Sequence, residues 1–214
     1  KDFKYQYANV TAAGSWRTGN NLNAGRSGVA GAGTRDAALA IGGDAPPSTA
    51  ATELYNGTNW TEVNDLQTAR AALAASGTST LALAFGGSGP SAKTETWNGT
   101  NWTEVNVMNA ARVILAGDGT STSSLAFGGS APPNTNATEL WNGTNWTAVN
   151  NLNTARGALA GAGADNTSAL AIGGSVSPRA QTELWNGTNW TEVNDLNTGR
   201  TYVTGTGIAT AALA

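Results

Sequence analysis

A segment of about 44 residues recurs along the chain, and this repeat limits the possible folds more than any other feature. The hexapeptide Asn-Trp-Thr-Glu-Val-Asn surrounds Trp60, Trp102 and Trp190, with a variant at Trp146 and a weaker copy that begins at Trp16. These tryptophans are 44, 42, 44 and 44 residues apart. A period of about 40–45 residues is typical of the four-stranded blade of a β-propeller. The repeat therefore predicts one array of similar β-sheet units.

Each unit divides into four short β-prone runs that are separated by turn residues. In the unit that begins at Arg70 the runs are 71–75, 81–85, 94–97 and 102–105. An Asn-Gly step separates the third run from the fourth, and it favours a tight hairpin because both residues tolerate positive φ. Helical repeats would need long patterns of period 3.6 without glycine, and this chain has none.

The two ends of the sequence complement each other. After Trp190 the last unit supplies only the first two strands of a blade, whereas Phe3–Tyr7 resembles a third strand and Ser15-Trp16 opens a fourth. We therefore predict an all-β fold: a five-bladed β-propeller of four-stranded antiparallel blades, closed by a composite blade from the N- and C-terminal segments. The chain is expected to form a single propeller domain, 1–214, with units of about 15–58, 59–100, 101–144, 145–188, and 189–214 plus 1–14.

Three features of the unit resemble the kelch repeat. In the unit from Arg70 they are the glycine pair Gly86-Gly87 after the second run, Trp97 near the end of the third, and Trp102 at the start of the fourth. The resemblance covers nearly the whole chain, and the near-identical copies look most like kelch-like proteins of marine phages and metagenomes. It implies a propeller that binds a partner or builds a structure, with a virion or extracellular location.

One arginine and one tryptophan recur in every unit, and we expect them to form a structural ring. Each arginine is predicted to be buried and hydrogen-bonded between blades, because a buried charge is costly unless it is paired. The recurring glutamates of the third run, Glu53, Glu95, Glu139 and Glu183, are the candidate partners; Tyr5 or Gln6 stands in that place in the composite blade. Anion binding by the arginines and sugar stacking by the tryptophans are the functional alternatives. The ring residues are Arg26, Arg70, Arg112, Arg156 and Arg200, with Trp16, Trp60, Trp102, Trp146 and Trp190.

Small residues in the first run of each unit are expected to line a narrow central axis. Examples are Ala30-Gly31 and Ala116-Gly117. A glycine also recurs just after these positions, where we expect a turn that needs unusual φ. These turn glycines are Gly33, Gly77, Gly119, Gly163 and Gly207.

Composition excludes several classes of function. Cysteine and histidine are absent, which removes thiolate nucleophiles, Ser-His-Asp triads and ordinary zinc sites. The acidic residues mostly follow the repeat, so no unique carboxylate pair for glycoside hydrolysis stands out. A net charge of −3 offers no basic surface for nucleic acid, and no apolar run is long enough to span a membrane. We expect a protein that is not an enzyme and that uses no cofactor and no metal.

The segments between the second and third runs carry the prolines and most of the variation between units. They are 44–51, 88–93, 130–137 and 175–181, and strand alternation places them on the face opposite the repeated Asn-Gly-Thr-Asn turns. Loops on a rigid scaffold commonly carry recognition, so we expect a ligand on this face. The candidate ligand-binding residues are Pro46, Pro47, Pro90, Lys93, Pro132, Pro133, Asn134, Pro178 and Arg179.

Two functions fit these observations. The first is a recognition module for a glycan or a host-surface protein, in a phage fibre or an adhesin, where near-identical blades would raise avidity through multivalency. The second is a purely structural or assembly scaffold built from recently amplified symmetric repeats. Fold alone does not separate them, because propellers host many functions.

Overall fold

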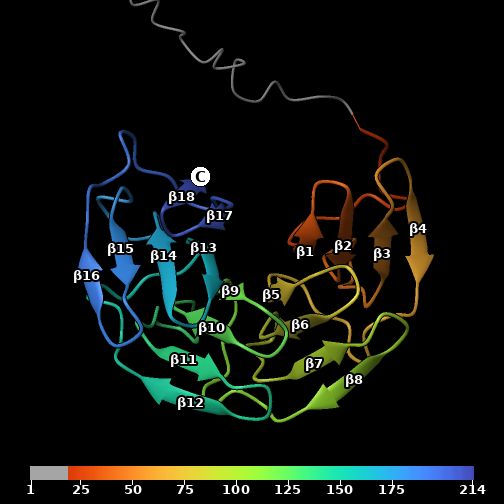
Figure 1. The fold of residues 1–214 in the computed structure, drawn as a ribbon, viewed down its shortest axis with the longest axis horizontal. Helices are drawn as coiled ribbons and strands as arrows, with labels where there is room; N and C mark the ends of the chain where they lie inside the picture. Colours follow the sequence, from red (N-terminus) through yellow and green to blue (C-terminus); the bar gives the residue numbers. More distant parts are fainter. Residues whose placement is uncertain (1–18) are drawn as a thin grey trace, which may run out of the picture.

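The structure, a computed structural model, describes residues 19–214. Its sheets radiate from a central axis, as Figure 1 shows, and they form an all-β propeller with four-stranded antiparallel blades. This part of the sequence-based prediction is confirmed. The described residues form four such blades and a smaller two-stranded sheet between the fourth blade and the first. The predicted pairing of Phe3–Trp16 with the C-terminal strands lies outside the described residues.

Each blade adds its strands in chain order from the axis outward. The first blade comprises β1 (Ala30–Thr34), β2 (Ala37–Ile41), β3 (Thr52–Tyr55) and β4 (Trp60–Val63). The second comprises β5 (Ala74–Gly77), β6 (Ala82–Phe85), β7 (Thr94–Trp97) and β8 (Trp102–Val105). The third comprises β9 (Ala116–Gly119), β10 (Ser124–Phe127), β11 (Thr138–Trp141) and β12 (Trp146–Val149).

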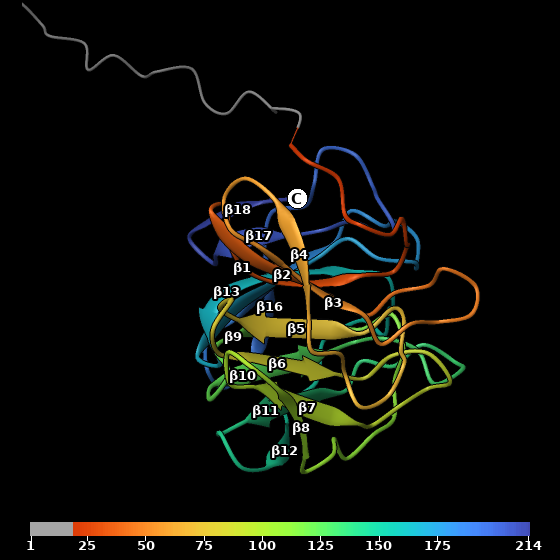
Figure 2. The ribbon, with the colours of Figure 1, turned by 90° about the vertical axis from the view of Figure 1, so that its right-hand side faces the viewer.

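The fourth blade comprises β13 (Ala160–Asp165), β14 (Ser168–Ile172), β15 (Thr182–Trp185) and β16 (Trp190–Glu192). The fifth sheet contains β17 (Thr206–Ile208) and β18 (Ala211–Leu213). Because consecutive strands are antiparallel, the β2–β3 type of loop leaves one face of the disc and the β3–β4 type of hairpin leaves the other, as the side view in Figure 2 shows. We call these the variable-loop face and the hairpin face. Within residues 19–214 no helix could cross a membrane.

The first strand of the second blade begins later than the sequence predicts. In the second blade the expected run is 71–75, but β5 starts at Ala74. The physical reason is that Ala72 has a left-handed φ of 52° and donates its N–H to the carbonyl of Gly28 in the first blade. That residue therefore joins neighbouring blades and cannot belong to the sheet ladder.

Glycine at the end of the first strand allows a sharp return into the second strand. Gly77 has φ +104°, and a Cβ built on it would lie 2.3 Å from the carbonyl oxygen of Leu81. The prediction of unusual φ is confirmed for four of the five turn glycines. It is wrong for Gly163, because a register shift between Gly163 and Asp165 lengthens that hairpin and relaxes the turn.

Tryptophan side chains join adjacent blades. The indole N–H of Trp102 donates to the hydroxyl of Thr52 at 3.1 Å, and that of Trp146 donates to Thr94 at 2.9 Å. Trp190 makes the same bond to the third blade. Each of these indoles comes from the outermost strand of its blade and reaches the third strand of the preceding one. Trp102, Trp146 and Trp190 therefore pack between blades, whereas Trp60 is half-buried and Trp16 lies outside the described residues.

Candidate functional site

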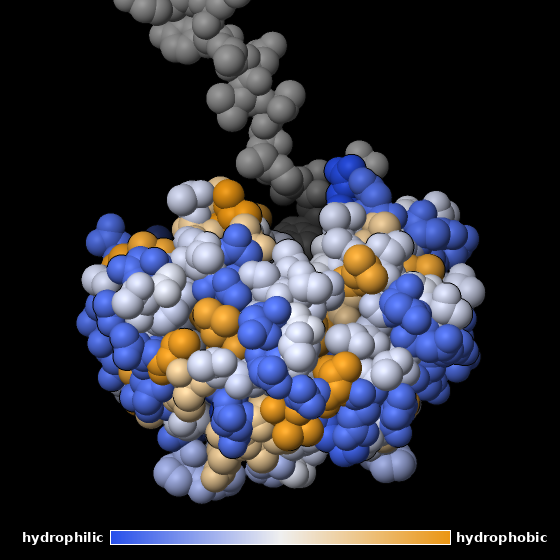
Figure 3. Space-filling view, turned by 60° about the horizontal axis from the view of Figure 1, so that its bottom comes forward, coloured by the Kyte–Doolittle hydropathy of each residue, from blue (hydrophilic) through white to orange (hydrophobic). Residues whose placement is uncertain are grey.

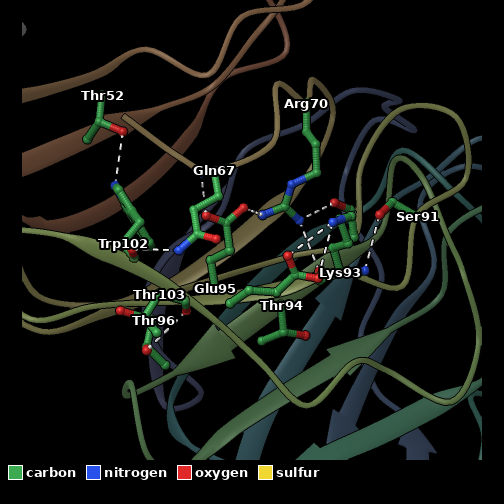
Figure 4. A network of polar contacts seen from close by, with 12 residues as sticks. Thr52, Gln67, Arg70, Ser91, Lys93, Thr94, Glu95, Thr96, Trp102 and Thr103 are labelled. Atoms are coloured by element: carbon green, nitrogen blue, oxygen red, sulfur yellow. Dashed lines mark hydrogen bonds and ion pairs between the residues drawn. The ribbon is translucent and has the colours of Figure 1, made fainter. Parts of the chain in front are cut away.

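A buried ion pair holds the segment that leads into the innermost strand of each blade. In the second blade Arg70 Nη2 lies 2.8 Å from Glu95 Oε1, as Figure 4 shows. Arg70 Nη1 also donates to the carbonyls of Gly86 and Lys93. The second carboxylate oxygen of Glu95 accepts the main-chain N–H of Gln67. Both charges are compensated within one blade.

The same arrangement recurs in the other complete blades. The predicted burial and glutamate pairing of Arg70, Arg112 and Arg156 are confirmed, and burial lowers the pKa of these three guanidinium groups. Their placement between blades is wrong, because each side chain bonds within the blade that it introduces. The remaining pairs are Arg26–Glu53, Arg112–Glu139 at 2.8 Å and Arg156–Glu183 at 3.1 Å.

The arginine main chain, in contrast, does connect blades. The carbonyl of Arg70 accepts the N–H of Gly43 in the first blade at 2.9 Å. Equivalent bonds join Arg112 to Gly87 and Arg156 to Gly129. Each arginine thus fixes its own blade through its side chain and the preceding blade through its carbonyl.

Arg200 departs from this pattern. Its side chain is exposed and donates to the carbonyl of Ala214 at 3.1 Å. No glutamate pairs with it within residues 19–214. The position predicted from the repeat for its partner, Tyr5 or Gln6, lies outside the described residues.

A chain of main-chain hydrogen bonds surrounds the axis on the variable-loop face. Ala72 donates to Gly28, Ile114 to Ala72, Ala158 to Ile114, and Tyr202 to Ala158, with lengths of 2.8–2.9 Å. All five residues have positive φ between 50° and 60°. This conformation is unusual for tyrosine and a genuine outlier for β-branched isoleucine. Strained backbone of this kind clusters at binding sites, and these five residues surround the opening of a cavity on the axis.

This opening leads into a funnel of about 540 Å³ on the axis. Its wall is mainly aliphatic, from residues such as Val29, Leu115 and Val203. Tyr202 stands at the rim with 77% of its surface exposed, and Asp44 contributes the only carboxylate among the lining residues. Apolar concave walls with a few polar groups are typical of ligand sites.

The nine loop residues selected from the sequence do not form a single pocket. All nine lie on the variable-loop segments, and the six prolines and Arg179 are exposed, but none of them lines the funnel. Lys93 is engaged by Glu104 at 3.1 Å, and the Asn134 amide donates to Ser175 Oγ at 2.9 Å. The structure therefore places these residues in separate loops on one face. Two of them, Lys93 and Asn134, are already bonded to other residues of the protein.

The residues that line the funnel were not among the predicted site residues. Gly28, Ala72, Ile114, Ala158 and Tyr202 are equivalent, each two positions after the repeated arginine. They differ in size from blade to blade within an otherwise regular segment. This variation in size could have marked a binding position, but it falls inside a run that the repeat pattern predicts as a β-strand.

Below the funnel the axis narrows to a channel of about 250 Å³ whose lining is rich in glycine. All five innermost strands contribute to it, β17 included. Asp118 is the only carboxylate among the lining residues, and burial raises its pKa to about 7 although the N–H of Gly119 donates to it. The proton of Asp118 is therefore held more tightly in the folded protein than in the unfolded chain.

We expect Asp118→Asn to stabilise the protein at pH 8 by up to about 4 kcal/mol, since the pKa rises from 3.8 to about 7 and each pKa unit corresponds to about 1.4 kcal/mol. A raised carboxyl pKa stabilises the protonated folded state, so the parent protein should lose stability as pH rises from about 4 to about 7. Urea unfolding of both proteins at pH 5 and pH 8 measures the effect. Equal pH dependence in parent and variant would contradict it.

No protein-family model matches the chain, and no curated protein matches it significantly. Within residues 19–214 no group of three or more acidic side chains is placed to hold a metal ion.

Proposed function

We propose that the protein is a non-enzymatic recognition module that binds a glycan or a protein surface on its variable-loop face, around the axial funnel. One observation carries this proposal. The variable β2–β3 loops and the variable funnel rim both lie on that face, while the Asn-Gly hairpins of the opposite face repeat almost without change. Variable loops on a rigid scaffold are a common arrangement for recognition.

The repeated hairpins have a sufficient structural role. Asn56 Oδ1 accepts the N–H groups of Thr58 and Asn59 and so closes the turn. The Asn59 side chain is then held by Asn20 from the segment before the first blade. The same two contacts recur in the next three hairpins. These polar side chains are occupied by the fold itself.

The surface chemistry also suits a binding protein. Figure 3 shows one side of the disc, where hydrophobic residues form small patches between hydrophilic ones. The glutamates that recur in the third strands are buried in arginine pairs, which supports a function that does not depend on carboxylate catalysis. The scaffold alternative is the outcome if no ligand is found for either face.

We further infer that the fifth sheet is completed by residues 3–16, giving a five-bladed, kelch-like propeller. Leu213 occupies the register of Leu39, Leu83 and Leu125, which are 0–1% exposed, yet Leu213 is 74% exposed. Within the described chain β18 pairs only with β17. An uncovered apolar strand edge favours the addition of another strand.

Deletion of residues 1–14 tests this closure. We expect the truncated protein to aggregate, because the edge of β18 and the Leu213 side chain would stay uncovered. Size-exclusion chromatography and thermal melting of both proteins provide the measurement. A truncated protein that remains monomeric with an unchanged Tm would contradict the five-bladed closure.

The binding proposal is tested by a glycan array and by capture of purified candidate surface proteins. For any ligand found, residues 130–137 are grafted into the three other variable loops, and a second variant changes Asn56, Asn98, Asn142 and Asn186 to Ser. We expect the graft to abolish binding and the hairpin variant to retain it. The reverse result in folded proteins would move the site to the hairpin face.

A further inference from the structure

We propose that the axial funnel binds an alkylammonium group, with the Asp44 carboxylate as its counter-ion and the Tyr202 ring against its alkyl part. This inference rests on the proposed function and specifies the chemistry at the centre of the variable-loop face. The same chemical group occurs on a lysine side chain of a protein and, as an amine on a polar ring, in an amino sugar. The experiment below separates these two sources.

The funnel carries a single charge. Asp44 is the only acidic residue among its lining residues, and no lysine or arginine contributes to the wall. The main chain of Asp44 bonds to Ser27 in both directions, at 2.7 and 3.0 Å. No cation pairs with the Asp44 carboxylate within residues 19–214. A carboxylate without a counter-ion beside apolar walls favours a cationic ligand.

Asp44 breaks the repeat at this position. The other three complete blades have serine there, at Ser88, Ser130 and Ser175. Ser88 Oγ accepts the N–H of Ala71 at 3.0 Å, and Ser175 accepts that of Gly157 at 3.3 Å. Serine therefore satisfies the local fold, and the acid in the first blade adds a charge that the fold does not require.

Tyr202 also breaks the repeat. It stands where the other blades have Gly28, Ala72, Ile114 and Ala158, and its φ is 55°. A left-handed conformation costs about 1–2 kcal/mol for such a residue, yet its side chain is largely exposed and gains little from burial. An aromatic ring held at the rim of the funnel can cover the alkyl part of a ligand whose cationic group lies at Asp44.

The aliphatic wall determines which cation fits. Val29, Ile114, Leu115 and Val203 offer apolar surface and no additional charge. A hydrated metal ion would find only one carboxylate there, whereas an alkylammonium buries its chain against the wall and presents its N–H donors to Asp44. The wall therefore favours an organic amine.

An NMR titration of the full chain with n-butylammonium chloride tests the proposal, with n-butanol as the uncharged probe at equal ionic strength. We expect amide shifts at Val29, Ile114 and Tyr202 and at least tenfold weaker binding of n-butanol. Asp44→Ser, which copies the other blades and should fold, is expected to weaken n-butylammonium binding about tenfold; Tyr202→Ala should weaken it about threefold. Asp36→Ser removes an exposed carboxylate outside the funnel and should have no effect.

The proposal is overturned if n-butanol binds as well as n-butylammonium, or if Asp44→Ser and Asp44→Asn, both folded, leave binding unchanged. Titration with Nα-acetyl-lysine methylamide and with glucosamine then identifies the source, since only the former has a flexible alkyl chain for the wall. Binding of n-butylammonium without any glycan or protein ligand would retain the funnel site and reject the recognition proposal. A glycan or protein ligand whose binding is lost in the loop graft but unchanged by Asp44→Ser would support the recognition proposal and reject the funnel site.

Discussion

Replacing Arg112 with methionine should lower the free energy of unfolding by about 3–5 kcal/mol, because it leaves a buried carboxylate without its partner. Arg112 is fully buried and bonds to Glu139 as well as to the carbonyls of Gly128 and Ala137. Methionine fills a similar volume but offers no donor to these three acceptors. Urea unfolding at pH 7 measures the loss, provided that the slope with denaturant stays constant.

Two variants separate the charge effect from packing. Arg200→Met changes the equivalent residue, which is exposed and pairs with no glutamate among the described residues, so it should cost less than about 1 kcal/mol. Adding Glu139→Gln to Arg112→Met should recover part of the loss by removing the unpaired charge. Equal losses for Arg112→Met and Arg200→Met would show that the buried pair is not the source of the effect.

Gly42→Ala is expected to destabilise the protein by about 3 kcal/mol or more. Gly42 has φ +62°, and a Cβ there would lie 2.4 Å from the main-chain oxygen of Arg70 in the next blade. The left-handed conformation costs alanine about 1–2 kcal/mol, and the clash adds about 1–3 kcal/mol because a backbone carbonyl cannot move aside without disturbing the blade contact. Thermal and urea unfolding both measure this loss.

Gly89→Ala is the matched control for that prediction. Gly89 has a similar φ of +73°, but no atom lies within 4 Å of the position that its Cβ would take. Only the conformational cost of about 1–2 kcal/mol should therefore appear. If both substitutions destabilised the protein equally, the tight contact between the first and second blades would have no energetic role.

Much of the fold is predictable from the sequence because each blade repeats the same turn chemistry. The runs 94–97 and 102–105 coincide with β7 and β8. The Asn-Gly hairpin between them fixes the end of β7, and the constant spacing from that hairpin to the tryptophan fixes the start of β8. Glycine pairs locate the end of the second strand in the same way. The buried arginines were found because a charged residue that recurs in an apolar stretch needs a recurring partner.

The remaining features depend on contacts between blades, which a local pattern does not contain. Nothing in the residues 71–73 distinguishes a strand from a left-handed connection; the bond from Ala72 to Gly28 decides it. The funnel was not predicted for the same reason, because Asp44 and Tyr202 are 158 positions apart and only the arrangement of the sheets around one axis brings both to one cavity. The proline loops, in contrast, could be assigned to one face from strand alternation alone.

The bonds that join blades allow the gene to exchange whole repeat units without loss of the contacts between them. Each of the three junctions between the complete blades uses residues that each copy supplies: an indole bonds to a threonine, and a glycine N–H bonds to an arginine carbonyl. Unequal recombination that shifts the sequence by a whole unit would regenerate each junction with the same atoms. Copies can therefore stay nearly identical without loss of interface, and the number of units is limited by how many innermost strands fit around the glycine-lined axis.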